Sequence, residues 1–321
     1  MQIIIHNKEQ DKYYWPAIQD DVTLEYNRKG APGNLYFKVL KDNILNFHEG
    51  DTVRMNYNGA NIFYGYVFIK RRNKDGSIAV TAYDQLRYLK NKDIYIIIDS
   101  KASDIIKRMA EDFQLQIGEI DDTEYVIPKH RSSNECLIDT IQDLLDKTME
   151  NTKKMFVLYD DFGKLMLKDI EKLKLDLLID AKTAEDFSYE SSIDKDTYNR
   201  VKLYYDNKET GKREVWIELD SANMKRWGVL QLTESVNAKK PLNFEQMADL
   251  KLKYFNRIKR TLTIQNALGD TRVRGGTMLY VNLNLGDMKL AKQIIVENVK
   301  HKFSNNLHLM DLTVRGDVIT G

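Results

Sequence analysis

The chain has 321 residues, enough for two or three domains, and its 42% hydrophobic and 30% charged content is ordinary for a globular protein. Its 49 basic and 48 acidic residues leave a formal charge of +1, which excludes the basic surplus that a dedicated duplex DNA binder needs. The single cysteine, Cys136, excludes an intrachain disulfide.

No targeting or membrane segment is visible in the sequence. The first ten residues, MQIIIHNKEQ, lack the basic stretch and long apolar core of a secretory signal. Apolar runs such as residues 94–98 are too short to cross a bilayer. We therefore expect a chain without a membrane segment that is made in the cytoplasm, where its cysteine stays reduced.

Residues 1–92 are dense in strand and turn signals. Four β-rich runs are separated by Gly-Asp, Asn-Gly or Asp-Gly pairs, at residues 35–41, 52–57, 62–69 and 77–83. Asn-Gly and Asp-Gly favour type I′ hairpin turns, because both central positions of this turn need a positive φ. Strands at this spacing predict a small antiparallel β-barrel as the N-terminal domain, residues 1–92.

Residues 93–185 predict an α+β module. Residues 94–98 are expected to form a buried strand, and a helix is expected to follow with Ser100 as its N-cap. A second helix is predicted from about Asn134. The apolar residues at helical spacing are Ala102, Ile105, Ile106, Met109 and Phe113 in the first helix, and Leu137, Ile138, Ile141, Leu144 and Leu145 in the second. A hairpin is predicted around Asp161-Phe162-Gly163.

Residues 186–321 predict a second β-barrel with a helical insertion near 243–258. Strand-like runs occur at residues 199–205, 213–219, 229–232 and 261–266. Asn243 and Gln246 are typical of a capping box, and Leu242 is placed to pack on Met247 at the start of the inserted helix. The chain as a whole is thus predicted to be a β-rich α+β protein with two small antiparallel barrels.

The last hairpin of the chain, within residues 296–316, carries the clearest alternation. Two sets of residues are expected to share one buried face: Val299, His301 and Phe303 before the Ser-Asn-Asn turn, and His308, Met310, Leu312 and Val314 after it. Upstream, residues 269–276 precede another strand pair, and Gly275-Gly276 is expected to form a tight turn or bulge.

No residue pattern predicts catalysis. Asp161-Phe162-Gly163 matches the metal-binding tripeptide of protein kinases but lacks the companion motifs, so a hairpin turn is preferred. The glycine-rich residues 269–276 precede a strand and not a helix, which disfavours a phosphate cradle. His301 and His308 share a face and are potential metal ligands, but apolar neighbours favour core histidines, and Asp311 is expected to point the other way.

The remaining reactive or charged residues are also better explained as structural. A lone cysteine at a helix start, Cys136, is more often a packing residue than a nucleophile, although His130 lies nearby in the sequence. Carboxylates in turns usually hold backbone groups. The pairs Asp160-Asp161 and Asp194/Asp196 are of this kind. The basic hairpin tip at residues 70–74 is expected to be solvated or to contact protein. A polar face or a partner surface is expected from the basic residues Lys251, Lys253, Arg257, Lys259 and Arg260. We therefore assign no catalytic, cofactor-binding or metal-ligating residue.

Several segments, taken in order, carry a family resemblance. They are residues 50–53, 62–67, 82–84, 88–89 and 91 in the first barrel, and residues 227–231, 274–278, 301–303 and 308–310 in the second. In their order and spacing they resemble the XkdQ/YqbQ-type hub proteins of Gram-positive prophages and phage-tail-like bacteriocins. That group is similar to the central baseplate hub of contractile-tailed phages and to the late-control protein D family.

This resemblance implies a structural protein and no enzyme. Members are expected to form a homotrimer that joins the sixfold tail tube to the threefold spike, with the tube protein, the spike protein and other baseplate proteins as partners. It also implies synthesis in the bacterial cytoplasm, assembly into the baseplate, no cofactor and no sequence-specific nucleic-acid binding. The residues alone leave open a glycan- or nucleic-acid-binding module, and a cell-wall hydrolase is less favoured because no acid–base constellation is visible.

Overall fold

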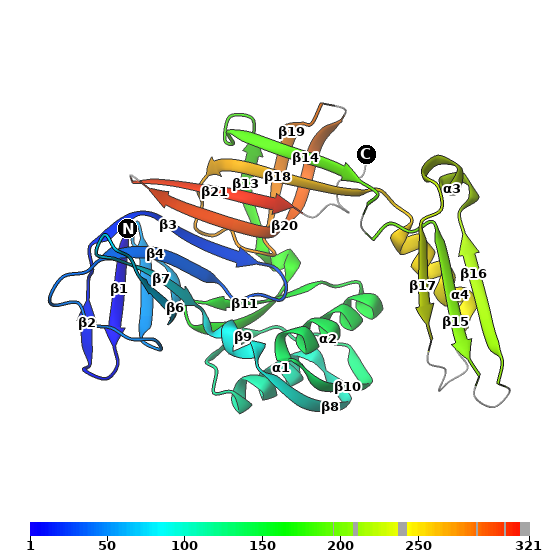
Figure 1. Ribbon diagram of the computed structural model, residues 1–321, viewed down its shortest axis with the longest axis horizontal. Coiled ribbons are helices and arrows are strands. Elements are labelled where there is room, and N and C mark those ends of the chain that lie inside the picture. The colour runs from blue at the N-terminus through cyan, green and yellow to red at the C-terminus, as the bar shows by residue number, and fades with distance from the viewer. Residues whose placement is uncertain (195, 208–210, 237–242, 287, 305, 315–321) are drawn as a thin grey trace. The chain divides into compact units, whose positions relative to one another are not determined.

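The computed structural model describes residues 1–194, 196–207, 211–236, 243–286, 288–304 and 306–314. These residues fall into two compact units (Figure 1). Unit 1 contains residues 1–188 and 262–314, and unit 2 contains residues 189–261.

The first β-dense region of unit 1 is a run of antiparallel strands. Its elements are β1 (Gln2–Asn7), β2 (Lys12–Tyr14), β3 (Ile18–Asn27), β4 (Asn34–Leu40), β5 (Thr52–Tyr57), β6 (Ala60–Arg72), β7 (Ser77–Tyr83) and the 3-10 helix η1 (Gln85–Lys90). Asn58 and Gly59 have φ values of 48° and 81°, which confirms the predicted type I′ turn between β5 and β6. Alternate side chains of these strands form one apolar core that also contains Phe303.

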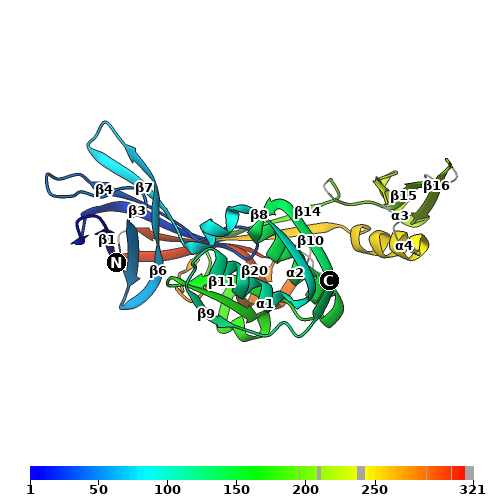
Figure 2. The ribbon, with the colours of Figure 1, turned by 90° about the horizontal axis from the view of Figure 1, so that it is seen from below.

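The second β-dense region of unit 1 joins the first in a single sheet. Its strands are β13 (Lys174–Asp180), β14 (Asp186–Ser192), β18 (Lys259–Leu268), β19 (Met278–Asn284), β20 (Lys289–Ser304) and β21 (Leu307–Val314), of which β14 and β18 span the boundary between the units. Strand β20 pairs antiparallel with β3, and His301 lies opposite Leu24 (Figure 1, Figure 2). The β-rich, mainly antiparallel character predicted from the sequence is confirmed.

The sheet is open among the described residues. Its order is β14-β18-β21-β20-β3-β4-β7-β6-β5-β1-β2, with β19 paired to β20 and β13 paired to β19, and the end strands β14 and β2 do not meet. Two separate closed barrels, as expected from the sequence, are therefore not found in this part of the chain. Alternation predicts which face of a strand is buried, but it does not specify which distant strand pairs with a given edge.

The α+β module of unit 1 places two helices on a two-stranded ribbon. Its elements are β8 (Lys92–Lys101), α1 (Ala102–Asp112), β9 (Ile117–Ile120), β10 (Val126–Cys136), α2 (Leu137–Thr152), β11 (Phe156–Asp161), β12 (Lys164–Asp169) and the 3-10 helix η2 (Ile170–Leu173). Both predicted helices are present, and their apolar stripes are buried except for the half-buried Phe113. Two start signals were misplaced: Ser100 lies within β8, and Asn134 lies within β10 at a register shift, with a φ of 59°.

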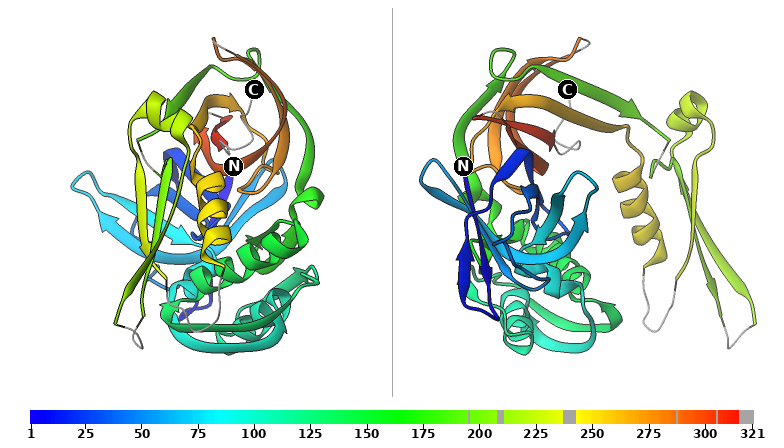
Figure 3. Two further views of the ribbon diagram at one scale, coloured as in Figure 1. Left: turned by 90° about the vertical axis from the view of Figure 1, so that its right-hand side faces the viewer. Right: turned by 60° about the vertical axis from the view of Figure 1, so that its left-hand side comes forward.

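Unit 2 is larger than the inserted helix expected near 243–258. It contains β15 (Arg200–Asp206), β16 (Arg213–Leu219), α3 (Ser221–Trp227), β17 (Gln231–Ser235) and α4 (Phe244–Phe255). The three strands form a sheet of their own, and α4 lies beside this sheet (Figure 3). Ala248 of α4 packs against Val201 and Leu203. The Asn243 side chain accepts a hydrogen bond from the Gln246 amide, which confirms the predicted N-cap, whereas Leu242 lies outside the described residues.

Candidate functional site

The closing hairpin buries the residues that the sequence predicts. Val299, Met310, Leu312 and the other alternating residues of β20 and β21 are inaccessible, and residue 305 of the turn lies outside the described residues. His301 is 1% and His308 8% exposed, and their rings lie side by side with His301 Nδ1 2.9 Å from His308 Nε2. Asp311 points the other way, as expected, and its carboxylate accepts a hydrogen bond from Lys302.

Hydrogen bonding fixes the protons of this histidine pair. The Val273 carbonyl can only accept, so His301 Nε2, 2.9 Å away, must donate. In the neutral ring His301 Nδ1 then accepts, and His308 Nε2 is the donor. Burial lowers the pKa of His301 to about 3 and that of His308 to about 4. The pair is thus neutral near pH 7, and both nitrogens of His301 are already engaged, as the core-histidine interpretation requires.

Acid is expected to destabilise the folded chain through this pair. Because the folded-state pKa values lie below the unfolded value of about 6.5, the stabilisation is complete above about pH 6.5 and is lost as the pH falls toward 4. We expect a loss of roughly 2 kcal/mol at about pH 5 for each histidine that stays neutral. A His308→Gln side chain can donate to His301 but does not titrate, so it should remove about half of this pH dependence.

Urea unfolding at several pH values measures this effect. Wild type and His308→Gln are compared at each pH, so that contributions of other groups cancel. Equal pH dependence in the two proteins would contradict the assigned role of the pair.

A second buried cluster joins three segments of unit 1. Asp84 follows β7, Asp160 is in β11, and Arg274 precedes β19; both carboxyl groups are buried. Arg274 Nη1 donates to the Asp160 carbonyl at 2.8 Å, and its guanidinium lies over the rings of Tyr159 and Tyr26, 4.4 and 5.3 Å from their centroids. The cluster therefore connects the first β region, the α+β module and the second β region. We call Asp84, Asp160 and Arg274 the charged junction.

The two carboxyl groups of the charged junction are raised in pKa, mainly because they are buried. Asp84 accepts hydrogen bonds from the Gly33 and Leu86 amides at 2.7 and 3.0 Å, yet burial and the neighbouring Asp160 hold its pKa well above the usual range. Burial raises the pKa of Asp160 to about 6, and its Oδ2 atom is buried without a hydrogen-bond partner. Raised pKa values in a cleft are typical of catalytic groups, but this cluster is enclosed by protein and connects structural elements.

Both glycine-containing turns that the sequence singled out lie beside the charged junction. Gly275-Gly276 forms a turn, as predicted, and the Gly276 amide donates to the Val296 carbonyl at 2.8 Å. Asp161-Phe162-Gly163 is the predicted hairpin: Phe162 and Gly163 have φ values of 47° and 85°. Phe162 packs edge-on against Tyr64 of β6, with 5.7 Å between ring centroids. These turns thus position segments and do not present a ligand cradle.

The other candidates do not belong to the charged junction. Cys136 caps α2, and its Sγ atom is 3.5 Å from the Lys90 carbonyl. The basic tip at residues 70–74 joins β6 and β7, and Lys70 bonds the Phe47 carbonyl. In unit 2, Lys251 pairs with Glu234 and Lys253 with Asp249, Lys259 and Arg260 belong to β18, and Asp194 and Asp196 flank residue 195, which lies outside the described residues.

One polar cluster was not anticipated from the sequence. His130 and Glu135 of β10 and Asp143 of α2 bring possible metal-ligand atoms within 4.8 Å of one another. However, the Lys147 ammonium group already contacts His130 Nδ1, and burial together with Lys147 lowers the pKa of His130. Because the Lys147 ammonium group already contacts His130 and both carboxylates are exposed, we treat the cluster as a polar contact between β10 and α2.

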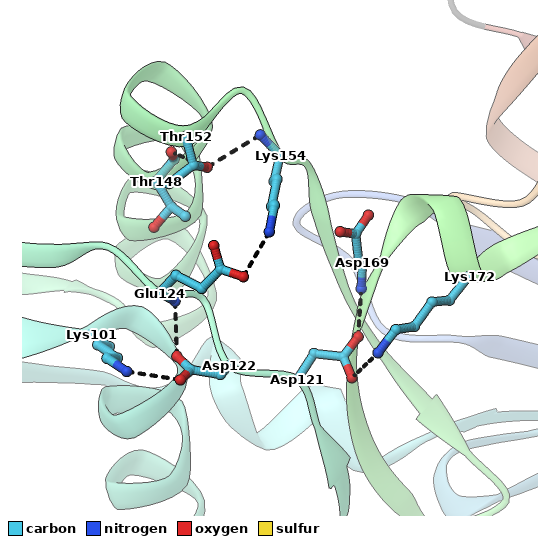
Figure 4. A network of polar contacts seen from close by, with 9 residues as sticks. All are labelled: Lys101, Asp121, Asp122, Glu124, Thr148, Thr152, Lys154, Asp169 and Lys172. Carbon is cyan, nitrogen blue, oxygen red and sulfur yellow. Dashed lines mark hydrogen bonds and ion pairs between the residues drawn. The ribbon is translucent and has the colours of Figure 1, made fainter.

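Three carboxylates in the segment before β10 are each paired with a lysine. Figure 4 shows the segment before β10 held by three lysines: Lys172 on Asp121, Lys101 on Asp122 and Lys154 on Glu124, at 2.6–2.8 Å. Hydrogen bonds from the Lys101 ammonium group and the Glu124 amide lower the pKa of Asp122. Burial alone would raise the pKa of Asp121, but hydrogen bonds from Lys172 and the Asp169 amide lower it overall. The exposed pairs of Asp122 and Glu124 contribute little stability individually.

One groove of about 370 Å³ offers little chemistry. It is lined by Trp15, Tyr57, Phe303 and Leu307 among others, without a carboxylate, histidine or lysine side chain. None of the helices in the described part of the chain is long and apolar enough to span a membrane.

Comparison with known proteins gives a consistent match over the full length. The profile of the YQBQ-like family matches residues 22–315. The Bacillus subtilis (strain 168) proteins YqbQ and XkdQ, the latter named a protein of the phage-like element PBSX, are each 30% identical to this chain. The alignments cover 92% of both chains for YqbQ, and 95% of this chain and 94% of XkdQ. The solved structure of the 43 kDa tail protein of prophage MuSo2 from Shewanella oneidensis has the same fold, with a TM-score of 0.71 and 13% identity over 100% of both chains.

Proposed function

The chain belongs to the YQBQ-like family, and from this premise we propose that it is a structural hub in the baseplate of a contractile phage-type tail or a phage-tail-like bacteriocin. The observation that carries the proposal is the full-length match to a protein of a phage-like element, together with the fold shared with a prophage tail protein. In this role the chain is a component of a particle and not an enzyme.

The finer part of the proposal concerns symmetry. A contractile tail tube has sixfold symmetry and its spike threefold symmetry, so a hub between them has to match both. A homotrimer in which each chain supplies two β regions presents six β regions to the tube and three subunits to the spike. We propose that residues 1–92 form one tube-type region, and that the second consists of the strands of residues 174–188 and 262–314.

Two features support this arrangement. The β20–β3 pairing makes the two β regions one continuous sheet, so that a subunit presents them in a fixed relation. The sheet ends β14 and β2 leave strand edges without a partner among the described residues, which fits barrels that close only against neighbouring subunits. Residues 93–173 are then the module between the β regions.

The proposal predicts three copies of the chain in each particle. Light scattering of the purified protein at increasing concentration should approach three times the mass of the chain, and the same stoichiometry is expected in isolated tails. Deletion of the gene should give tubes without attached spikes.

A dimer or monomer in the native particle would contradict the hub. Glycan or nucleic-acid binding by the purified chain, with no place in a tail, would favour a binding module instead. Peptidoglycan cleavage that depends on one carboxylate would favour a hydrolase.

A further inference from the structure

The β8–β10 ribbon has one buried and one exposed face. Tyr95 and Ile97 of β8 point into the core formed with α1 and α2. The alternate residues Ile94, Ile96 and Ile98 point to the opposite face and are 60%, 57% and 58% exposed. The ribbon lies at the border of unit 1, with the helices on its inner side (Figure 1, Figure 3). The run at residues 94–98, expected to be wholly buried, is thus buried on one side only.

A second line of side chains runs beside the isoleucines on the same face. The antiparallel register places Lys129 opposite Ile98, Arg131 opposite Ile96 and Ser133 opposite Ile94. Lys129 and Arg131 are exposed. Lys92 is two residues before Ile94 and follows the same alternation. We call these residues the isoleucine face: an aliphatic line on β8, a basic line on β10 about 5 Å away, and no acidic side chain between them.

Such a face is unusual for a surface that meets only water. Single exposed aliphatic residues are common, but three in register on one strand form a contiguous apolar stripe, which in soluble proteins marks an interaction surface. All three isoleucines are more than half exposed, so nothing in the described part of the chain covers the stripe.

We propose that the isoleucine face binds another protein, through a surface on which a line of aliphatic side chains runs parallel to a line of carboxylates. The aliphatic line would cover Ile94, Ile96 and Ile98, and the carboxylates would pair with Lys129 and Arg131. Charge complementarity selects this partner, since the charged side chains bordering the stripe on this face are basic. The inference rests on this face and does not require the trimeric hub.

Other occupants fit less well. A second copy docked face to face would bring Lys92, Lys129 and Arg131 against the same cations. A bilayer fits less well because this flat face carries no aromatic anchor. Nucleic acid would match the cations but would leave the isoleucines uncovered.

Site-specific photocrosslinking tests the proposal in the assembled particle. A benzophenone side chain at position 96 of the full chain is irradiated, and the linked peptide is identified by mass spectrometry. The expected product is a peptide of a different protein that carries aliphatic and acidic residues. The double change Lys129→Glu and Arg131→Glu should lower the yield about tenfold, and lysines in place of the partner's carboxylates should restore it.

The matched control is the double change Arg71→Glu and Arg72→Glu, which alters the charge equally at the exposed β6–β7 tip and should leave the yield unchanged. Melting temperatures of all variants should equal that of wild type, because the changed residues are exposed. A crosslink to a second copy, to lipid or to nucleic acid would overturn the proposal. The absence of any crosslink would also overturn it, as would an equal crosslink yield with and without the charge reversal at Lys129 and Arg131.

Discussion

An Asp84→Ala variant is expected to lose about 3–5 kcal/mol of folding stability, a large part of what a chain of this kind has. The carboxylate accepts hydrogen bonds from the Gly33 and Leu86 amides, and alanine would leave both donors buried without a partner. The alanine variant would also leave a cavity where the carboxyl group was. Gly33 packs so closely here that a Cβ on it would lie 2.5 Å from Asp84 Oδ2, but glycine has no side chain that could fill this cavity. The Arg274 guanidinium would in addition lose its coulombic interaction with this buried carboxyl group.

Urea unfolding near neutral pH measures the loss, with Asp161→Ala as the matched control. Asp161 lies next to the charged junction but is exposed, so its truncation should change stability by less than about 0.5 kcal/mol. Asp84→Asn should fall between the two, because an amide oxygen can still accept one of the two backbone bonds. Equal stability of Asp84→Ala and the control would mean that the charged junction does not hold the three segments together.

Local patterns predicted the elements of this chain more successfully than their assembly. The alternation through Val299, His301 and Phe303 predicted the buried face of the closing hairpin, because side-chain direction in a strand follows from period two alone. Asn243 likewise predicted a helix start, since an N-cap bonds a backbone amide only three residues away.

Local sequence patterns could not predict the charged junction. Asp84, Asp160 and Arg274 are separated by more than seventy residues, and each alone reads as a turn or loop residue. Asp84 carried a weak local signal, since it caps η1 through the Leu86 amide, but nothing local indicates that it is buried beside a second carboxylate. Long-range strand pairing is hidden in the same way, so the β20–β3 contact that unites the two β regions could not be predicted.

The sequence also did not reveal that one face of β8 is exposed. Residues 94–98 are uniformly apolar in the sequence except for Tyr95, which is typical of a strand buried on both sides. The structure covers only the side facing α1 and α2. An apolar run therefore predicts that both faces need cover, but not whether the same chain provides it.

Gly275→Ala is expected to destabilise the chain by more than about 4 kcal/mol, because there is no room for a methyl group. A Cβ at this position would overlap the backbone N of Arg28 and the carbonyl carbon of Asn27. These are backbone atoms at the end of β3, and they are held in place by the hydrogen bond from the Arg28 amide to the Glu297 carbonyl, at 2.8 Å. Relief would require the turn before β19 to separate from β3, which breaks the connection between the two β regions.

Gly50→Ala separates this packing effect from backbone strain. Gly50 has a φ of 90° with open space around its Cα, so alanine there should cost only the conformational strain of about 1–2 kcal/mol. Thermal or urea unfolding compares the two variants, and hydrogen exchange should find lost protection in β20 and β3 of the Gly275→Ala protein. If Gly275→Ala were no less stable than Gly50→Ala, the turn and the end of β3 would not be in contact. The continuous sheet would then lack the close packing that the proposed hub needs to present both β regions together.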